Sequence, residues 1–168
     1  MKKILFLTGT RADFGKIKSL IQILEQQQGF EVFVFVTGMH LQKQYGYTLI
    51  EIERCSFKNT HTFENHTHET TMDLTLAKTI EGLSAYVKTI HPDLIVVHGD
   101  RVETLAGAIV GSLNNILVAH IEGGEVSGTV DELIRHSVSK LSHIHFVSNA
   151  GAAKRLKQMG EIKSSFLR

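Results

Sequence analysis

Acidic side chains follow two apolar segments that have the composition of buried strands. Residues 93–98 (DLIVVH) lead into a glycine and then Asp100, and residues 116–120 (ILVAH) are followed closely by Glu122. In an open parallel sheet, ligands bind in the crevice outside the carboxyl ends of the strands, where short loops present polar groups on a rigid scaffold. Glu125 follows Glu122 after two glycines. We therefore expect Asp100, Glu122 and Glu125 to lie where chemistry takes place.

Asp100 and Glu122 have different structural alternatives. Asp100 precedes a predicted helix, so it could act as the helix N-cap, a common role for aspartate, and Arg101 could pair with it. Glu122 precedes Gly123 and Gly124, which provide backbone freedom and allow a ligand to approach closely. Because a structural glutamate rarely needs such neighbours, the functional interpretation is stronger for Glu122, whereas capping and function are compatible for Asp100.

A third group of ionisable side chains lies at a predicted helix start, in residues 127–136. Asp131 and Glu132 fall in its first turn, where acidic residues stabilise the helix dipole whatever their function. By helical spacing, Asp131 shares a face with Arg135, and Glu132 shares a face with His136. One face could point into the crevice while the other packs or meets solvent, and the spacing favours neither.

The segment 9–15 (GTRADFG) places Arg11 between two glycines at a predicted helix entry. Backbone N–H groups and the helix dipole favour an anion there, and Arg11 would add a charge-assisted contact to a phosphate. The segment is neither a GxGxxG fingerprint nor a P-loop, so the alternative is a capped turn with a solvated arginine. We favour the anion site.

Histidines and acids in residues 60–71 resemble a metal cluster at first sight, namely His61, Glu64, His66, His68 and Glu69. The segment lacks HExxH order and any cysteine, so we interpret it as a polar loop and expect no metal. Histidines 143 and 145 alternate with apolar residues and are interpreted as structural. The single cysteine, Cys55, cannot form an internal disulfide and is interpreted as a semi-buried thiol.

Strands and helices alternate along the chain. Apolar runs predict strands at residues 3–8, 31–37, 93–98, 116–120 and 143–147. Helical periodicity predicts helices at residues 16–28, 72–90, 102–113, 130–141 and 150–159. Residues 48–52 are ambiguous, and residues 60–71 and 162–168 are expected to form no regular element. This order requires right-handed βαβ crossovers, so the sequence predicts an α/β fold with a Rossmann-like, doubly wound parallel sheet.

The composition indicates one globular domain over residues 1–168. With 42% hydrophobic residues the chain can bury a sizeable core, and a formal net charge of +1 does not favour binding to nucleic acid or a membrane surface. No apolar run is long enough to span a bilayer, and no cleavable signal pattern is present. We expect a cytoplasmic protein with no nucleic-acid or membrane partner.

Several blocks of sequence together resemble the hydrolysing UDP-N-acetylglucosamine 2-epimerases of sialic-acid biosynthesis. They are residues 9–15 (GTRADFG), 37–40 (TGMH), 98–101 (HGDR), 120–132 (HIEGGEVSGTVDE) and 134–136 (IRH). The resemblance extends over nearly the whole chain. It implies the N-terminal Rossmann-like domain of a two-domain GT-B-type fold whose C-terminal nucleotide-binding domain is absent from this sequence. It also implies a nucleotide-sugar substrate, no cofactor and a homo-oligomer.

The implied reaction converts UDP-N-acetylglucosamine to N-acetylmannosamine and UDP. UDP leaves C1 as a base removes the C2 proton, which gives 2-acetamidoglucal, and water then adds with a proton delivered to the other face of C2. Such steps need acid/base groups on both faces of the sugar and contacts to the diphosphate. The resemblance implies that the acid/base carboxylates are Asp100, Glu122 and Asp131, with Glu132 in reserve. It implies that the substrate or diphosphate contacts are Arg11, Arg135 and His136.

Two alternatives remain open at this point. One is the same chemistry on UDP-N,N′-diacetylbacillosamine, and the other is a truncated, non-catalytic domain that binds a nucleotide sugar. The choice of base and acid among the carboxylates is also open. Because a reaction in an interdomain cleft loses positioning when one wall is missing, we expect the 168 residues alone to turn over substrate poorly.

Overall fold

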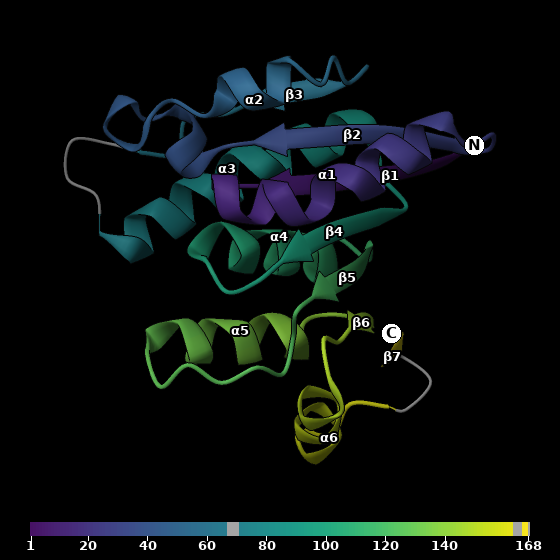
Figure 1. Ribbon diagram of the computed structural model, residues 1–168, viewed down its shortest axis with the longest axis vertical. Coiled ribbons are helices and arrows are strands. Elements are labelled where there is room, and N and C mark those ends of the chain that lie inside the picture. The colour runs from purple at the N-terminus through teal and green to yellow at the C-terminus, as the bar shows by residue number, and fades with distance from the viewer. Residues whose placement is uncertain (67–70, 163–165, 168) are drawn as a thin grey trace.

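The computed structural model describes residues 1–66, 71–162 and 166–167. These residues form a seven-stranded sheet in the order β3-β2-β1-β4-β5-β6-β7 (Figure 1), and every adjacent pair is parallel. The strands are β1 (Lys2–Thr8), β2 (Phe30–Val36), β3 (Thr60–Thr62), β4 (Leu94–His98), β5 (Leu117–Ile121), β6 (Ile144–Phe146) and β7 (Phe166–Leu167). The chain winds outward from β1 to β3, returns to β4 and winds outward on the other side. This order confirms the predicted Rossmann-like, doubly wound sheet.

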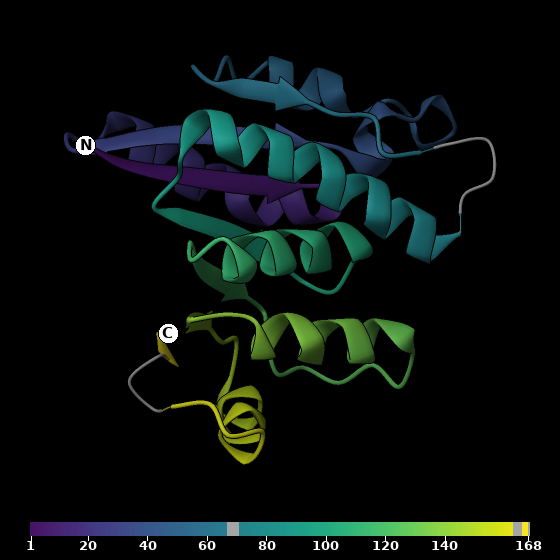
Figure 2. The same ribbon diagram turned by 180° about the vertical axis from the view of Figure 1, so that it is seen from behind.

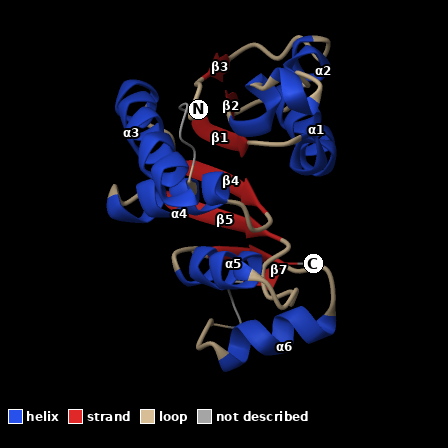
Figure 3. Cartoon of the chain, turned by 90° about the vertical axis from the view of Figure 1, so that its left-hand side faces the viewer, coloured by secondary structure: helices blue, strands red, loops and turns tan. Residues whose placement is uncertain are grey.

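Helices cover both faces of the sheet, as the edge-on view in Figure 3 shows. The α-helices are α1 (Arg11–Gln26), α2 (Leu49–Glu53), α3 (Met72–Ile90), α4 (Val102–Leu113), α5 (Val130–Lys140) and α6 (Ala150–Gln158). Two short 3₁₀ helices, η1 (Gly38–Leu41) and η2 (Lys43–Tyr45), follow β2. Seen from behind, α3, α4 and α5 lie in front of the sheet (Figure 2), and α1 and α2 cover its other face.

Strand β1 shows how the two layers are held. Its Leu5 and Leu7 belong to the buried cluster that includes side chains of α3, α4 and α5. Its Ile4 and Phe6 belong to the cluster that includes side chains of α1 and α2. Successive side chains of a strand point to opposite faces, so a continuous apolar run is what a parallel sheet buried on both faces requires.

The prediction that residues 60–71 and 162–168 contain no regular element was wrong at two short strands. Residues 60–62 form the edge strand β3, which pairs with the end of β2 in the register Val34↔Thr60. Residues 166–167 pair with β6 as β7. Each of these strands is at most three residues long and depends on a neighbouring strand for its hydrogen bonds, so no period is visible in its own sequence.

Helix α1 also begins earlier than its apolar periodicity predicted, at Arg11 rather than residue 16. A capping box fixes this start, because the Thr10 hydroxyl accepts from the Asp13 N–H while the Asp13 carboxylate accepts from the Thr10 N–H. Of the ambiguous residues 48–52, residues 49–52 belong to the short helix α2, and Thr48 is its N-cap. Within the described ranges no helix is long and apolar enough to cross a membrane.

Replacing either of two glycines inside helices by alanine should change the stability of the fold in opposite directions. A Cβ added at Gly111 in α4 would collide with the side chain of Val118 in β5, whereas nothing lies within 4 Å of a Cβ added at Gly15 in α1. We expect Gly111→Ala to lower the free energy of unfolding by about 1–3 kcal/mol through overpacking. We expect Gly15→Ala to raise it by about 0.5–1 kcal/mol, because alanine is the better helix former. Urea unfolding measures both, and equal effects would contradict the close packing of α4 on β5.

Candidate active site

A cavity of about 380 Å³ opens at the carboxyl ends of β1, β4 and β5, where the strand order reverses. This is the edge at which doubly wound sheets bind ligands. The cavity brings together four of the residues that the sequence singled out, because its lining includes Asp100, Glu122, Asp131 and Arg135. The first two follow β4 and β5, and the other two lie on the face of α5 that turns toward the sheet edge.

The Asp100 carboxylate is held by helix α5 and does not cap α4. Its Oδ2 pairs with Nη2 of Arg135, and both side chains are largely buried. Arg135 also donates from Nη1 to the carbonyl oxygen of Glu125 at 3.3 Å. The N-cap of α4 is Arg101, whose side chain makes no capping bond. The possible pair between Arg101 and Asp100 is not formed, because Nε of Arg101 lies 3.3 Å from Oε2 of Glu103.

Glu122 leaves β5 with a left-handed backbone, at φ 64°. Such a conformation costs a residue other than glycine about 1–3 kcal/mol and persists where the surroundings impose it, often at functional sites. Here the Glu122 N–H donates to the carbonyl of Phe146 at 2.9 Å. In the carboxylate, Oε2 lies 3.3 Å from Nε2 of His98 and Oε1 lies 3.5 Å from Nζ of Lys16.

The two glycines after Glu122 make room for the protein itself. A Cβ at Gly123 would lie 2.8 Å from both Nδ1 of His120 and Oγ of Ser139. Gly124, at φ 80°, packs against the backbone of α6. The close approach that the sequence suggested for a ligand is therefore made by β5, α5 and α6.

No role was predicted for His120 itself, which supports the site without lining the cavity. It is fully buried, its Nε2 donates to the carbonyl of Gly99 at 2.8 Å, and its Nδ1 lies 3.1 Å from Oγ of Ser139. Burial lowers the pKa of His120 to about 3. A neutral ring therefore ties the turn before Asp100 to helix α5.

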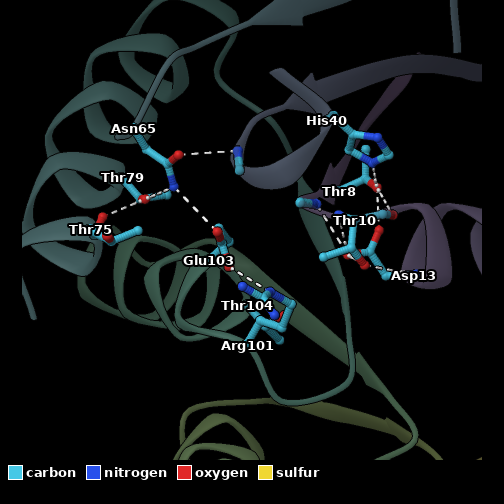
Figure 4. Close-up of polar contacts among 12 residues, drawn as sticks. Thr8, Thr10, Asp13, His40, Asn65, Thr75, Thr79, Arg101, Glu103 and Thr104 are labelled. Atoms are coloured by element: carbon cyan, nitrogen blue, oxygen red, sulfur yellow. Dashed lines mark hydrogen bonds and ion pairs between the residues drawn. The ribbon is translucent and has the colours of Figure 1, made fainter. Parts of the chain in front are cut away.

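A second buried histidine fixes the first loop (Figure 4). Nε2 of His40 lies 2.9 Å from Oγ1 of Thr8, and the Thr8 hydroxyl donates to Asp13. On the other side of the ring, Nδ1 lies 2.7 Å from Oγ1 of Thr48. Since the Thr8 proton goes to the carboxylate, its oxygen accepts from His40 Nε2–H, and Nδ1 accepts from Thr48. Burial lowers the pKa of His40 to about 4, which keeps the ring neutral.

The Asp13 carboxylate closes this chain of hydrogen bonds. It also accepts from the N–H groups of Gly9 and Thr10, at 3.1 and 2.9 Å. Burial raises the pKa of Asp13, while the hydrogen bonds from Thr8 and the loop oppose that shift. Asp13 lines the cavity. Its hydrogen bonds to Gly9 and Thr10 hold the loop that carries Arg11.

A second buried carboxylate, Glu103, lies on the other side of the same edge (Figure 4). Its Oε2 pairs with Arg101, and its Oε1 accepts from Nδ2 of Asn65 at 3.4 Å. The Asn65 side chain in turn accepts from the N–H of Gly38 at 3.1 Å and donates to Oγ1 of Thr79 at 2.9 Å. Arg101 lines the cavity, and Glu103 orients it.

The remaining residues of the sequence prediction lie outside this cavity. Glu125 is one of them, and its Oε1 accepts from Oγ of Ser148 at 2.6 Å and from Nδ2 of Asn149 at 2.7 Å. Arg11 is 73% exposed and pairs with Glu51 at 3.0 Å, beside an adjoining cavity that shares Thr10, Ala12 and Met39 with the first. His136 lies on another face of α5, where its Nε2 is 3.7 Å from Oε1 of Glu132. Glu132 also accepts from the N–H groups of Ser127 and Gly128, both at 2.8 Å, and so closes the loop before α5.

The histidine-rich segment shows no metal arrangement among the residues that the structure covers. No group of three or more histidine, cysteine or acidic side chains there could hold an ion. His61 stacks on Tyr86 with ring centroids 4.2 Å apart. His68 and Glu69 lie outside the described residues. The expectation that no metal binds remains a prediction.

Comparisons with known proteins agree on one family. The family model for UDP-N-acetylglucosamine 2-epimerase matches residues 22–167. The chain is 52% identical over 161 residues to a UDP-N-acetylglucosamine 2-epimerase of Neisseria meningitidis serogroup B, covering 96% of this chain and 43% of that protein. It is 38% identical over 164 residues to the hydrolysing UDP-N,N′-diacetylbacillosamine 2-epimerase of Legionella pneumophila, covering 96% and 44%. The chain thus spans less than half the length of these relatives.

A solved structure of a UDP-N-acetylglucosamine 2-epimerase has a similar fold. The UDP-N-acetylglucosamine 2-epimerase of Methanocaldococcus jannaschii, in complex with UDP-N-acetylglucosamine and UDP, superposes with a TM-score of 0.85 at 25% identity. The match covers 99% of this chain and 46% of that one.

Acid should destabilise the fold through its two buried neutral histidines. Their pKa values, about 4 for His40 and about 3 for His120, lie below the ordinary 6.5. A histidine with a lowered folded pKa contributes its full stability above about pH 6.5 and loses it as the pH falls toward the folded value. At pH 5 each should have lost about 2 kcal/mol relative to pH 8.

Urea unfolding between pH 8 and pH 5 tests this, with His120→Gln as the comparison. The raised pKa of Asp13 acts in the opposite direction at the acid end, so the change of slope in the variant isolates the contribution of His120. The variant should lose less stability than the natural protein over this range. Parallel curves would contradict the neutral, buried ring.

Proposed function

The chain belongs to the UDP-N-acetylglucosamine 2-epimerase family, and from that premise we propose that it carries the acid/base carboxylates of a hydrolysing epimerase. The proposed reaction converts UDP-N-acetylglucosamine to N-acetylmannosamine and UDP. The observation that carries the proposal is that Asp100 and Glu122, at the ends of the adjacent strands β4 and β5, line one cavity together with Asp131.

The chemistry requires this kind of arrangement. In the first step a carboxylate takes the C2 proton while the bond from C1 to the UDP oxygen breaks, which leaves 2-acetamidoglucal and UDP. In the second step water adds at C1 and a proton is delivered to the opposite face of C2. Inversion therefore needs carboxyl groups on two sides of one cavity, within hydrogen-bond reach of the sugar.

Cationic side chains near the carboxylates suit the charge that develops as UDP leaves. Arg135 already lies in the cavity, and Arg11, which lines the adjoining cavity, is exposed and could meet a phosphate. The proposed contact from His136 rests on the resemblance alone, because this side chain points to another face of α5.

We further propose that residues 1–168 are the N-terminal half of a two-domain, GT-B-type enzyme. The chain covers only 43% and 44% of two relatives, so those proteins have further sequence that can form the opposite wall of the cleft and hold the nucleotide. A cavity open on one side positions a substrate poorly. The 168 residues alone should therefore bind and turn over the nucleotide sugar weakly.

UDP-N,N′-diacetylbacillosamine is the second candidate substrate, because one relative is named for it. The higher identity, 52% against 38%, belongs to the relative named for UDP-N-acetylglucosamine and favours that substrate. Comparing kcat/KM for the two nucleotide sugars with an active enzyme that contains this chain separates them.

Replacing either carboxylate by its amide should abolish proton transfer with little change of size. In an active enzyme that contains this chain, we expect Asp100→Asn and Glu122→Gln each to lower kcat by about 10²–10⁴-fold with KM nearly unchanged. Asp93→Asn is the matched control, because this carboxylate lies at the amino end of β4 and pairs with Lys2. Near-normal kcat in both site variants would remove these residues from the mechanism.

The elimination step leaves a mark in the product. If the C2 proton is lost to the enzyme and replaced from solvent, the reaction in D₂O places one deuterium at C2 of N-acetylmannosamine. Proton NMR or mass spectrometry of the product measures it. A product with no solvent deuterium at C2 would exclude elimination and hydration.

A further inference from the structure

The ring of His98 lies beside the candidate active site with one nitrogen unsatisfied. His98 is the last residue of β4, its side chain is 9% exposed, and it lines the cavity. Within the described residues its buried Nε2 has no hydrogen-bond partner of good geometry. Buried polar groups are nearly always paired, so an unpaired one at the border of a cavity requires an explanation.

The carboxylate oxygen next to this nitrogen is Oε2 of Glu122, at 3.3 Å. That distance is short enough for an ion pair, but the two groups are not aligned for a hydrogen bond. Catalytic hydrogen bonds are often long or poorly aligned without substrate and tighten when it binds.

The backbone keeps the two side chains together. His98 pairs with Ile121 in the parallel register of β4 and β5, so Glu122 is the next residue along β5. The left-handed backbone of Glu122 then sets the direction in which its side chain leaves the strand. Both partners are attached to the most regular part of the fold.

The other neighbour of the Glu122 carboxylate, Lys16, constrains its orientation less. Lys16 lies 3.5 Å from Oε1, but its side chain is 62% exposed and long. An exposed lysine gains little from such a pair and samples many rotamers. Of the two contacts, the one with His98 is the one that can fix the orientation of the carboxylate.

We infer that His98 is a positioning residue for Glu122, donating from Nε2 to Oε2 and leaving Oε1 to exchange the C2 proton with the sugar. The inference rests on the proposed function, since it specifies how one of the proposed carboxylates is aimed. A displacement of about 1 Å at a reacting group can cost about a hundredfold in rate. One fixed hydrogen bond to a side chain with three rotatable bonds is therefore worth a measurable part of kcat.

Two amide variants of His98 test this with matched chemistry. The side-chain N–H of glutamine reaches about as far as Nε2 of histidine, whereas that of asparagine is one methylene shorter. In an active enzyme that contains this chain, we expect His98→Asn to lower kcat at least about tenfold with KM within about threefold, and His98→Gln to retain at least about a third of kcat. His143→Asn, an exposed histidine before β6, is the control for general effects.

A double-mutant cycle decides whether His98 acts through Glu122. If it does, His98→Asn should cost no more than about twofold when added to Glu122→Gln. Near-normal kcat in Glu122→Gln would overturn the proposed role of Glu122 itself. Three other outcomes would overturn the positioning role and leave the proposed function standing. They are slow turnover in Glu122→Gln together with normal turnover in His98→Asn, equal losses in both His98 variants, and losses that multiply in the double variant.

Discussion

Two carboxylates buried beneath the carboxyl edge of the sheet, Asp13 and Glu103, are the constraint on which the candidate site depends. Burying an ionised group costs several kcal/mol unless donors surround it. Asp13 is met by donors from the end of β1 and the first loop, and Glu103 by Arg101 and Asn65. Satisfying them ties β1, α1, α4 and the segment after β3 into one unit, which leaves the loops of this edge little freedom.

Two buried histidines behind this edge, His40 and His120, also have hydrogen-bond partners on both ring nitrogens. His40 continues the donor chain from Asp13 toward Thr48, and His120 links the turn at Gly99 to Ser139 of α5. Both rings are neutral because burial penalises their charged form. Neutral histidines with both ring nitrogens paired therefore support the loops that carry Asp100 and Asp13. The exposed charges near the site, Arg11 and Lys16, are on the solvent side.

Local pattern was sufficient for the framework of the fold and for the edge of the sheet at which the candidate site lies. Helices α3 and α4 have the predicted bounds, and the carboxylates that follow β4 and β5 share a cavity. The partners of the buried groups could not be predicted, because they are separated along the chain. His120 bonds a residue 19 positions later and one 21 positions earlier, and Arg135 bonds Asp100, 35 positions away. The edge strands β3 and β7 were missed because their pairing depends on the neighbouring strand.

Helix α5 resolves the choice that its sequence left open and shows how one arginine can serve two purposes. Asp131 and Arg135 face the cavity, while Glu132 and His136 pair with each other on another face. A guanidinium has five N–H donors in a planar fork, and the bonds of Arg135 to Asp100 and to the Glu125 carbonyl use two of them. A phosphate oxygen at the cavity could accept from the others without breaking either bond. Holding Asp100 and contacting an anionic leaving group are therefore compatible roles, whereas a lysine, a single flexible charge, would have to choose between them.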